Sequence, residues 1–279
     1  MRTAVITDST SYLPDGWALT HDVVVVPVQV IVDAHALDET DAEQAADVIA
    51  ALRAGAQVST SRPSPARFTA AVEQMSDRGY DEAVIITVSS ALSGTYEAAC
   101  SAATNAPIPV QVVDSRSIGM GLGFPVMAAA AAAQDQADSD VVAARVREQA
   151  RATDIFFYVD TLEYLRRGGR VASASAFVGQ ALHVKPILRI VDGHVEPVDR
   201  VRTEGKAINR LVELALAGLT GPTHEVAISD LDAAGRADAV AEQVRALVPG
   251  ISIVRTKIGG VVGAHTGPGI VAITTSPLV

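Results

Sequence analysis

The sequence is poor in cysteine, in aromatic residues and in charge. Its 279 residues include one cysteine, Cys100, so an internal disulfide is impossible. Aromatic residues make up 4% and charged residues 19% of the chain, whereas hydrophobic residues reach 49%. This composition is typical of a globular chain with a sizeable core and excludes a disordered one. A chain of this length forms one large domain or two ordinary ones.

Positive charge is also scarce. The chain has 22 Lys and Arg against 32 Asp and Glu, which gives a net charge of -10 and a pI of about 5.0. Such a chain has no overall attraction for nucleic acid or an anionic membrane, so we expect an anion to bind only at a local site.

Long apolar runs are missing too. The most apolar stretch, residues 118–133, is shorter than the ~20 residues that a membrane span needs, and we interpret it as a buried helix. The N-terminus reaches an acid at Asp8 before any apolar segment, which argues against a signal peptide. With the single cysteine, these features favour a cytoplasmic protein without an integral membrane segment.

Several catalytic and cofactor motifs are absent. The sequence contains neither a phosphate-binding G-x-x-x-x-G-K-[ST] loop nor a zinc-binding H-E-x-x-H motif. Gly119, Gly121 and Gly123 lack the G-x-G-x-x-G spacing of a dinucleotide site. The six histidines are scattered without metal-ligand spacing. We therefore expect no metal and no cofactor, and a self-contained kinase or metalloenzyme is disfavoured.

The first half of the chain alternates β-branched apolar runs with helical segments. Strands are expected at residues 4–7, 23–32, 82–88 and 109–113, and helices at 42–54, 66–75, 93–103, 120–134 and 139–152. This alternation predicts βαβ units and a mainly parallel sheet. Pro27 places the run 23–32 at an edge or in an irregular position.

The second half has a different pattern. Strands are expected at 154–159, 184–191, 194–198, 225–229, 251–255 and 269–274, and helical segments at 162–165, 206–217 and 233–247. Asp192-Gly193 lies between two of these strands and predicts a hairpin. We predict an α/β protein of two domains, a mainly parallel α/β domain at residues 1–152 and a mixed α+β domain at 153–279.

Polar clusters follow several of the expected strands or precede helices, where ligands of parallel sheets usually bind. Ser93-Gly94-Thr95 lies where a strand gives way to a helix. The first amides of a helix have no intrahelical partner and the helix dipole favours negative charge, so this segment can hold an anion. It also fits a plain helix N-cap. A serine nucleophile is disfavoured because the G-x-S-x-G context is missing.

Two further segments could contribute to such a site. Thr60-Ser61-Arg62-Pro63 forms a second hydroxyl-rich turn before an expected helix, with capping as the simpler interpretation. His265 stands in an expected Gly/Pro loop, where it could donate to an anion or lie in solvent. Arg166, Arg167, Arg170, Arg200 and Arg202 concentrate positive charge, either as solvated turns or as a docking patch for an acidic partner.

Short segments spread over nearly the whole chain match one family in order. They are VITDST at 5–10, TSRPS at 60–64, LSGTY at 92–96, VDS at 113–115, YLRRGGR at 164–170, KPIL at 185–188, RT and KA within 202–207, and HTGPG at 265–269. Each segment is weakly specific, but together they resemble the DegV family, the fatty-acid-binding subunits of bacterial fatty acid kinases.

The resemblance implies a two-domain DegV-like fold that buries a long-chain fatty acid and has no catalytic residues of its own. In the family, the fatty-acid carboxylate is held by positions that correspond here to Thr60 with Ser61 beside it, Ser93, Gly94 and His265. The implied partner is a separate ATP-binding kinase that phosphorylates the bound carboxylate. The family's kinase-docking arginine corresponds to Arg202.

This sequence departs from the family pattern at two places. Arg62 stands where the family usually has glutamine, which makes it a possible neighbour of the head group. Glu204-Gly205 replaces a pair that is often basic, so docking to the usual kinase stays open. Two other functions also stay open: a serine-dependent acyl hydrolase that uses Ser93 and His265, and a sensor of a small anion or sugar phosphate.

Overall fold

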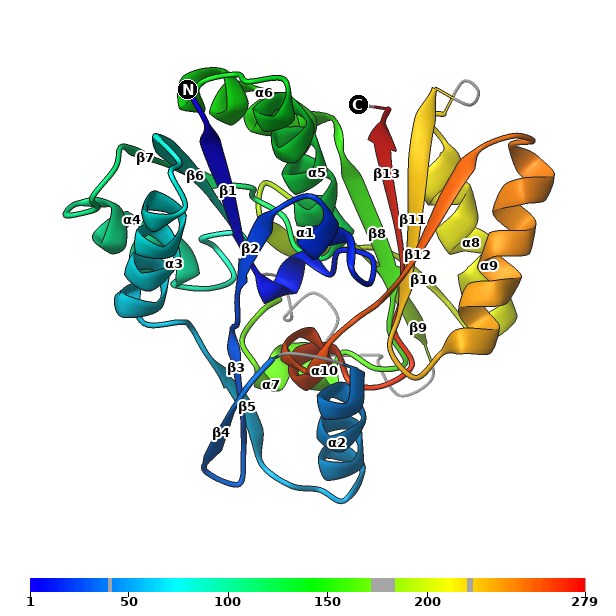
Figure 1. The fold of residues 1–279 in the computed structure, drawn as a ribbon. Coiled ribbons are helices and arrows are strands. Elements are labelled where there is room, and N and C mark those ends of the chain that lie inside the picture. The colour runs from blue at the N-terminus through cyan, green and yellow to red at the C-terminus, as the bar shows by residue number, and fades with distance from the viewer. Residues whose placement is uncertain (40–41, 172–183, 220–222, 279) are drawn as a thin grey trace.

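A four-stranded parallel sheet dominates the first part of the chain (Figure 1). The structure is a computed structural model and describes residues 1–39, 42–171, 184–219 and 223–278. In the spatial order β2-β1-β6-β7, the sheet consists of β2 (Val23–Val26), β1 (Thr3–Asp8), β6 (Glu82–Thr87) and β7 (Val110–Asp114). Every neighbouring pair is parallel. The two central strands are buried throughout, as expected for a parallel sheet with both faces covered.

Helices cover both faces of this sheet because successive strand residues point to opposite sides. Ala4 and Ile6 pack against one helical layer, and Val5 packs against the other. The first layer contains α3 (Pro65–Asp77) and α4 (Thr95–Ala103), and the second contains α5 (Met120–Gln134) and α6 (Ser139–Ala152). Short η1 (Ser9–Ser11) and α1 (Trp17–Thr20) follow β1.

A second sheet of six strands is built from the later part of the chain. Its order is β10-β9-β8-β13-β11-β12, with β8 (Asp154–Tyr158), β9 (Lys185–Val191), β10 (His194–Val201), β11 (His224–Asp230), β12 (Ser252–Lys257) and β13 (Val271–Pro277). Only the β11–β12 pair is parallel, so the sheet is mixed. Helices α8 (Glu204–Leu216) and α9 (Ala234–Leu247) pack on one face.

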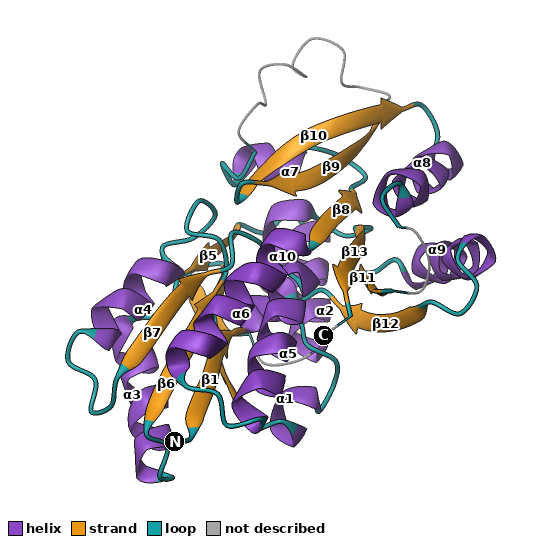
Figure 2. Cartoon of the chain, turned by 90° about the horizontal axis from the view of Figure 1, so that it is seen from above, coloured by secondary structure: helices purple, strands orange, loops and turns teal. Residues whose placement is uncertain are grey.

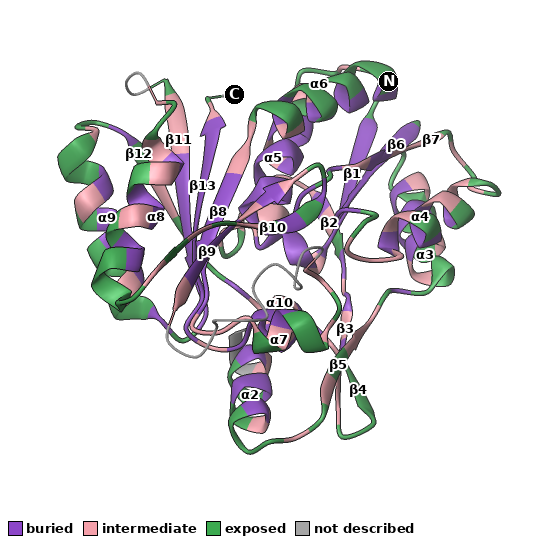
Figure 3. Ribbon diagram, turned by 180° about the vertical axis from the view of Figure 1, so that it is seen from behind, coloured by how far each residue is buried: buried purple, intermediate pink, exposed green. Residues whose placement is uncertain are grey.

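Helices α5 and α6 lie between the two large sheets and contact both (Figure 2). This position explains why α5 is apolar around most of its circumference instead of along one stripe. Figure 3 shows that the central strands β1, β6 and β13 are mostly buried, whereas the outer side of α9 is exposed. None of the helices in the described ranges combines the length and apolarity that crossing a membrane requires.

A small antiparallel sheet completes the fold at the lower end of Figure 1. Its order is β4-β3-β5, with β4 (His35–Asp38), β3 (Gln29–Val32) and β5 (Val58–Ser61). Helix α2 (Ala42–Arg53) and α10 (Gly260–Thr266), which comes from the end of the chain, pack against it. Helix α7 (Glu163–Arg167) packs against α10. Distant parts of the sequence therefore meet here.

Some local predictions are wrong in detail. The run 23–32 is not one strand: it breaks at Pro27, which cannot donate a backbone hydrogen bond, and its halves enter different sheets. The first half does form an edge strand, as Pro27 suggested. The segment 59–63, predicted as a turn, begins within β5 because it pairs with β3. The helix expected from residue 93 starts at Thr95.

Other local predictions are confirmed. Asp192 and Gly193 connect β9 and β10 with positive φ angles of 49° and 85°, as the Asp-Gly turn signal requires. Pro65 occupies the start of α3 and Ser64 its N-cap position, although the Ser64 hydroxyl accepts no capping hydrogen bond from a backbone amide. The overall class is the predicted one, an α/β fold with a parallel sheet and a separate mixed sheet.

Candidate functional site

A cavity of about 280 Å³ lies among the three sheets. The carboxyl end of the parallel sheet contributes Thr10 and Val88, the small sheet contributes Thr60 and the mixed sheet contributes Phe157. Ligands of parallel α/β sheets usually bind beyond the carboxyl ends of the strands, and the cavity is at that edge.

Most of the cavity wall is apolar. Ile155 and Phe157 face the cavity, whereas Phe156 and Tyr158 pack under α8 and α9, because neighbouring residues of a strand point to opposite faces. The mixed sheet thus has two buried faces with different partners. The other aliphatic residues along the wall come from hairpin β9–β10, from α7, from α10 and from loops: Leu92, Ile118, Leu165, Ile190, Val195, Ile258, Val261, Val262 and Ile270.

The polar part of the cavity centres on Thr60 and His265. Thr60 Oγ1 lies 2.8 Å from His265 Nε2, a hydrogen bond between β5 and α10 that joins residues 205 positions apart. The prediction that His265 stands in a Gly/Pro loop is wrong, because it belongs to the last turn of α10. The helix ends at the next glycine, Gly267, whose φ of 73° favours a residue without a side chain.

A second glycine allows the close approach of α7 to this histidine. A Cβ on Gly168 would lie 2.2 Å from His265 Nδ1, so no side chain fits at that position. Nδ1 itself is buried and has no hydrogen-bond partner in the described structure. The ring is therefore held by Thr60 on one side and by tight packing on the other.

Ser93 and Gly94 line the cavity at the start of α4. Ser93 Oγ lies 2.8 Å from Thr95 Oγ1, and the Ser93 amide donates to the Ser89 carbonyl at 3.1 Å. Gly94 occupies the N-cap position, so the interpretation of Ser93 as the helix cap is wrong. The first amides of this nine-residue helix begin directly beyond the two residues.

Two arginines, Arg62 and Arg170, also line the cavity. Arg62 Nη1 donates to the Gly94 carbonyl at 3.4 Å and fills the space where a Gly94 side chain would be. Arg170 Nε donates to the Leu92 carbonyl at 3.1 Å. Sequence reasoning placed Arg170 only within a basic turn and missed its position on the cavity wall. Ser61 also lines the cavity, but its hydroxyl donates to the Arg62 carbonyl.

The environment of His265 keeps its ring neutral. Burial and, to a smaller extent, the nearby charge of Arg170 together lower the pKa of His265 from 6.5 to about 4. At neutral pH the polar end of the cavity therefore consists of a neutral imidazole, hydroxyls and backbone amides beside two guanidinium groups.

A buried carboxylate holds α10 in place from the other end. Glu39 accepts hydrogen bonds from Ser9 Oγ at 2.7 Å, from the Val261 amide at 2.8 Å and from the Tyr12 hydroxyl at 3.1 Å. Burial raises the pKa of Glu39 despite these donors. Tyr12 also lines the cavity and accepts from the Val262 amide at 3.2 Å. No local motif marked Glu39 or Tyr12, because their role depends on the distant helix.

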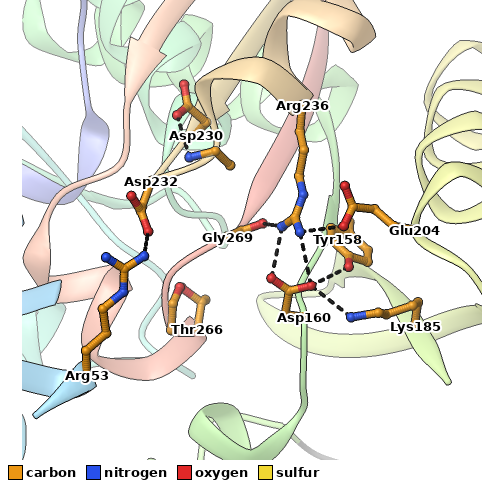
Figure 4. A network of polar contacts seen from close by, with 12 residues as sticks. Arg53, Tyr158, Asp160, Lys185, Glu204, Asp230, Asp232, Arg236, Thr266 and Gly269 are labelled. Carbon is orange, nitrogen blue, oxygen red and sulfur yellow. Dashed lines mark hydrogen bonds and ion pairs between the residues drawn. The ribbon is translucent and has the colours of Figure 1, made fainter. Parts of the chain in front are cut away.

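An ion-pair network secures the segment after α10 (Figure 4). Arg236 Nη1 donates to the Gly269 carbonyl at 2.8 Å and to Asp160 at 2.9 Å, and its Nη2 donates to Glu204 at 2.6 Å. Asp160 also accepts from Lys185 at 2.9 Å. Glu204, part of the unusual Glu204-Gly205 pair, is thus engaged within the molecule.

Arg202 lies outside the cavity lining. It is exposed and precedes Thr203, whose hydroxyl accepts from the Lys206 amide and caps α8. In the described part of the chain, no group of three or more His, Cys, Asp or Glu side chains could hold a metal ion.

Comparison with known proteins places this architecture in a family. A sequence profile of the DegV family, whose members are described as uncharacterised proteins, matches residues 2–278. The chain belongs to the DegV family. A DegV domain-containing protein of Streptomyces coelicolor is 41% identical to it over 274 residues, which cover 98% of each chain. A fatty acid-binding protein of Thermotoga maritima is 30% identical, over 97% of this chain and 96% of its own.

Solved DegV structures share the whole fold. A fatty-acid-binding DegV family protein from Thermus thermophilus superposes with a TM-score of 0.92 at 29% identity, covering 100% of both chains. The DegV fatty acid binding protein of Bacillus subtilis superposes with a TM-score of 0.89 at 28% identity, also over 100% of both chains. The family resemblance and the fold class expected from the sequence are confirmed.

The lowered pKa of His265 predicts a specific pH dependence of stability. The folded-state pKa lies below the unfolded value of 6.5, so the unfolded chain binds the proton more readily. The contribution is complete above pH 6.5 and is lost as the pH falls toward 4, by up to about 3 kcal/mol. His265→Gln should lack this part of the decrease when unfolding free energies from denaturant titrations are compared at neutral pH and just above pH 4. Equal decreases in both proteins would contradict the assignment.

Proposed function

We propose that this DegV protein binds a long-chain fatty acid in the cavity, with the carboxylate at Thr60, Ser93, Gly94 and His265. One observation carries the proposal: a cavity with mainly apolar walls ends at hydrogen-bond donors, and no acidic side chain among the described residues lines it. Fatty acid binding by the relatives from Thermotoga maritima and Thermus thermophilus supports the same ligand class.

The acyl tail supplies most of the affinity in this proposal. Burying a methylene contributes ~0.8 kcal/mol, so about fifteen methylenes contribute roughly 12 kcal/mol before the costs of lost freedom and desolvation. The polar end then orients the head group, because a carboxylate leaves water only where donors replace its hydration.

The neutral histidine leaves the Thr60 hydroxyl free to donate to the carboxylate. Nδ1 of His265 has no partner among the described groups, which favours the tautomer with the proton on Nε2. Nε2–H then donates to Thr60 Oγ1, and the Thr60 hydroxyl hydrogen is free to donate into the cavity. Ser93 and the amides at the start of α4 supply further donors. Ser61 contributes less in this arrangement, since its hydroxyl is directed to the backbone.

The protein acts as a carrier in this proposal and contributes no catalytic residue, metal or cofactor. A serine hydrolase needs a base beside the nucleophile and a group that orients the base. Here Ser93 Oγ pairs with Thr95, His265 Nε2 pairs with Thr60, and no described carboxylate meets Nδ1. A small anion would not contact the long apolar wall, so an anion sensor fits this cavity less well than a fatty acid carrier.

A separate ATP-dependent fatty acid kinase is the proposed partner, in the cytoplasm. The carboxylate would be phosphorylated at the mouth, and the exposed Arg202 would contact the kinase. Dividing the chain at residue 152 gives a first domain with Thr60, Ser93 and Gly94 and a second domain with His265, so both domains would hold the head group.

Ser93→Ala should weaken fatty acid binding about tenfold, because a hydrogen bond to a charged acceptor is lost. Calorimetric titration with a long-chain fatty acid, together with thermal unfolding, checks the affinity and the fold. Ser101→Ala, at an exposed position of the same helix, is the matched control and should bind as the wild type does. Wild-type affinity in Ser93→Ala would refute this head-group site.

Arg202→Ala should preserve fatty acid binding but reduce phosphorylation of the bound acid by the partner kinase about tenfold, because an interfacial charge is removed. The assay measures acyl phosphate formation with ATP and the fatty acid kinase of the same organism. Arg147→Ala, on the exposed side of α6, serves as the charge-matched control. Equal rates for both variants would remove Arg202 from the docking surface.

A further inference from the structure

The mouth of the cavity, defined here as the polar end with Arg62 and Arg170, carries more positive charge than one carboxylate needs to be neutralised. Arg62 and Arg170 both line the cavity, and the hydrogen bonds of their side chains go to backbone carbonyls. Neither forms an ion pair with a carboxylate in the described ranges. Other arginines of the same chain do, including those in the pairs Arg53–Asp232, Arg189–Asp154 and Arg236–Asp160.

Arg62 and Arg170 give the cavity a local positive charge. The chain as a whole has a net charge of -10, yet no Asp or Glu within the described ranges lines the cavity. His265 adds no charge at neutral pH, so the two guanidinium groups define the charge of the mouth. Two cations that meet no carboxylate in the described part of the chain, at the end of an apolar cavity, indicate a ligand whose head group carries close to two negative charges.

We propose that Arg62 and Arg170 make this mouth selective for a chain that ends in a phosphate dianion over one that ends in a carboxylate, with Arg62 as the specificity-determining residue. The inference rests on the proposed acyl-binding function and names the head group that the site prefers. A phosphate monoester carries a charge of about -1.5 to -2 at neutral pH and offers three acceptor oxygens, whereas a carboxylate carries a single charge.

The two arginines differ in how firmly the protein holds them. Arg170 donates to the Leu92 carbonyl at 3.1 Å and to the Gly168 carbonyl at 2.6 Å, so much of its donor capacity is used. Arg62 is exposed and makes one long contact, 3.4 Å, to the Gly94 carbonyl. Its remaining N–H groups are available to a ligand beside Ser93 and Gly94. A glutamine, usual in the family at this position, would supply no charge.

The experiment compares three amphiphiles with the same tail. Dodecanoate, dodecyl sulfate and dodecyl phosphate are titrated calorimetrically at micromolar concentrations into the wild type, Arg62→Gln and Arg245→Gln. The sulfate has the tetrahedral head of the phosphate with a single charge, so it separates charge from shape. Arg245 is exposed near the end of α9, away from the cavity lining, and controls for the loss of a surface charge.

The expected result is that the wild type and Arg245→Gln bind dodecyl phosphate about tenfold more tightly than either dodecyl sulfate or dodecanoate. In Arg62→Gln, binding of dodecyl phosphate should weaken most, so this variant should lose most of the preference. Excess inorganic phosphate should leave dodecyl phosphate bound. Its displacement by inorganic phosphate would overturn the acyl-linked site in favour of a free-phosphate site.

Two other results would overturn the inference. One is equal binding of the three amphiphiles by the wild type, and the other is an intact phosphate preference in Arg62→Gln. In either case dodecanoate binding would leave the proposed fatty acid function standing. If none of the three amphiphiles binds, the proposed function fails together with the inference.

Discussion

The hydrogen bond between Thr60 and His265 is the contact on which the site depends. It closes the cavity by joining the small sheet near the start of the chain to α10 near its end. The bond forms only because the surroundings hold α10 in place: Glu39 accepts from the Val261 amide at one end of the helix, and Gly168 admits α7 beside the histidine. A buried carboxylate without these donors would be costly, so the same contacts that satisfy Glu39 also orient α10, which carries His265.

The mixed sheet forms much of the apolar wall of the cavity. One face packs under α8 and α9, and the other face supplies Ile155 and Phe157 to the cavity. A sheet with two apolar faces needs a second cover, and here α5, α10 and the acyl ligand of the proposed function share that role. The parallel sheet contributes the strand-to-helix turn at Ser93 and Gly94. The mixed sheet thus supplies much of the apolar wall, whereas the polar residues Thr60, Ser93 and His265 come from three different elements.

The sequence predicts what depends on local chemistry. The Asp192-Gly193 turn, the edge strand before Pro27 and the polar helix start at Ser93 and Gly94 each follow from the conformational preferences of a few residues. Family resemblance pointed to Thr60 and His265, but periodicity did not. Their local structures were predicted wrongly because β5 exists only through pairing with β3, and α10 exists only through packing against distant elements.

Other site residues escaped prediction for the same reason. Glu39 reads as an ordinary acid before a helix, and its burial results from Tyr12 and the amides of α10. Arg170 reads as one of several charges in a basic turn, and only the fold brings it to Leu92 and the cavity. Long-range convergence of this kind depends on tertiary packing and leaves no periodic signal in the sequence.

Native mass spectrometry of the purified protein, followed by extraction with organic solvent and identification of the released molecules, tests the central claim most directly. A long-chain acyl ligand at close to one per chain is expected, because the cavity is apolar and enclosed by three sheets. A protein that carries no lipid after gentle purification, and takes none up when fatty acid is offered back, would contradict a lipid-binding function.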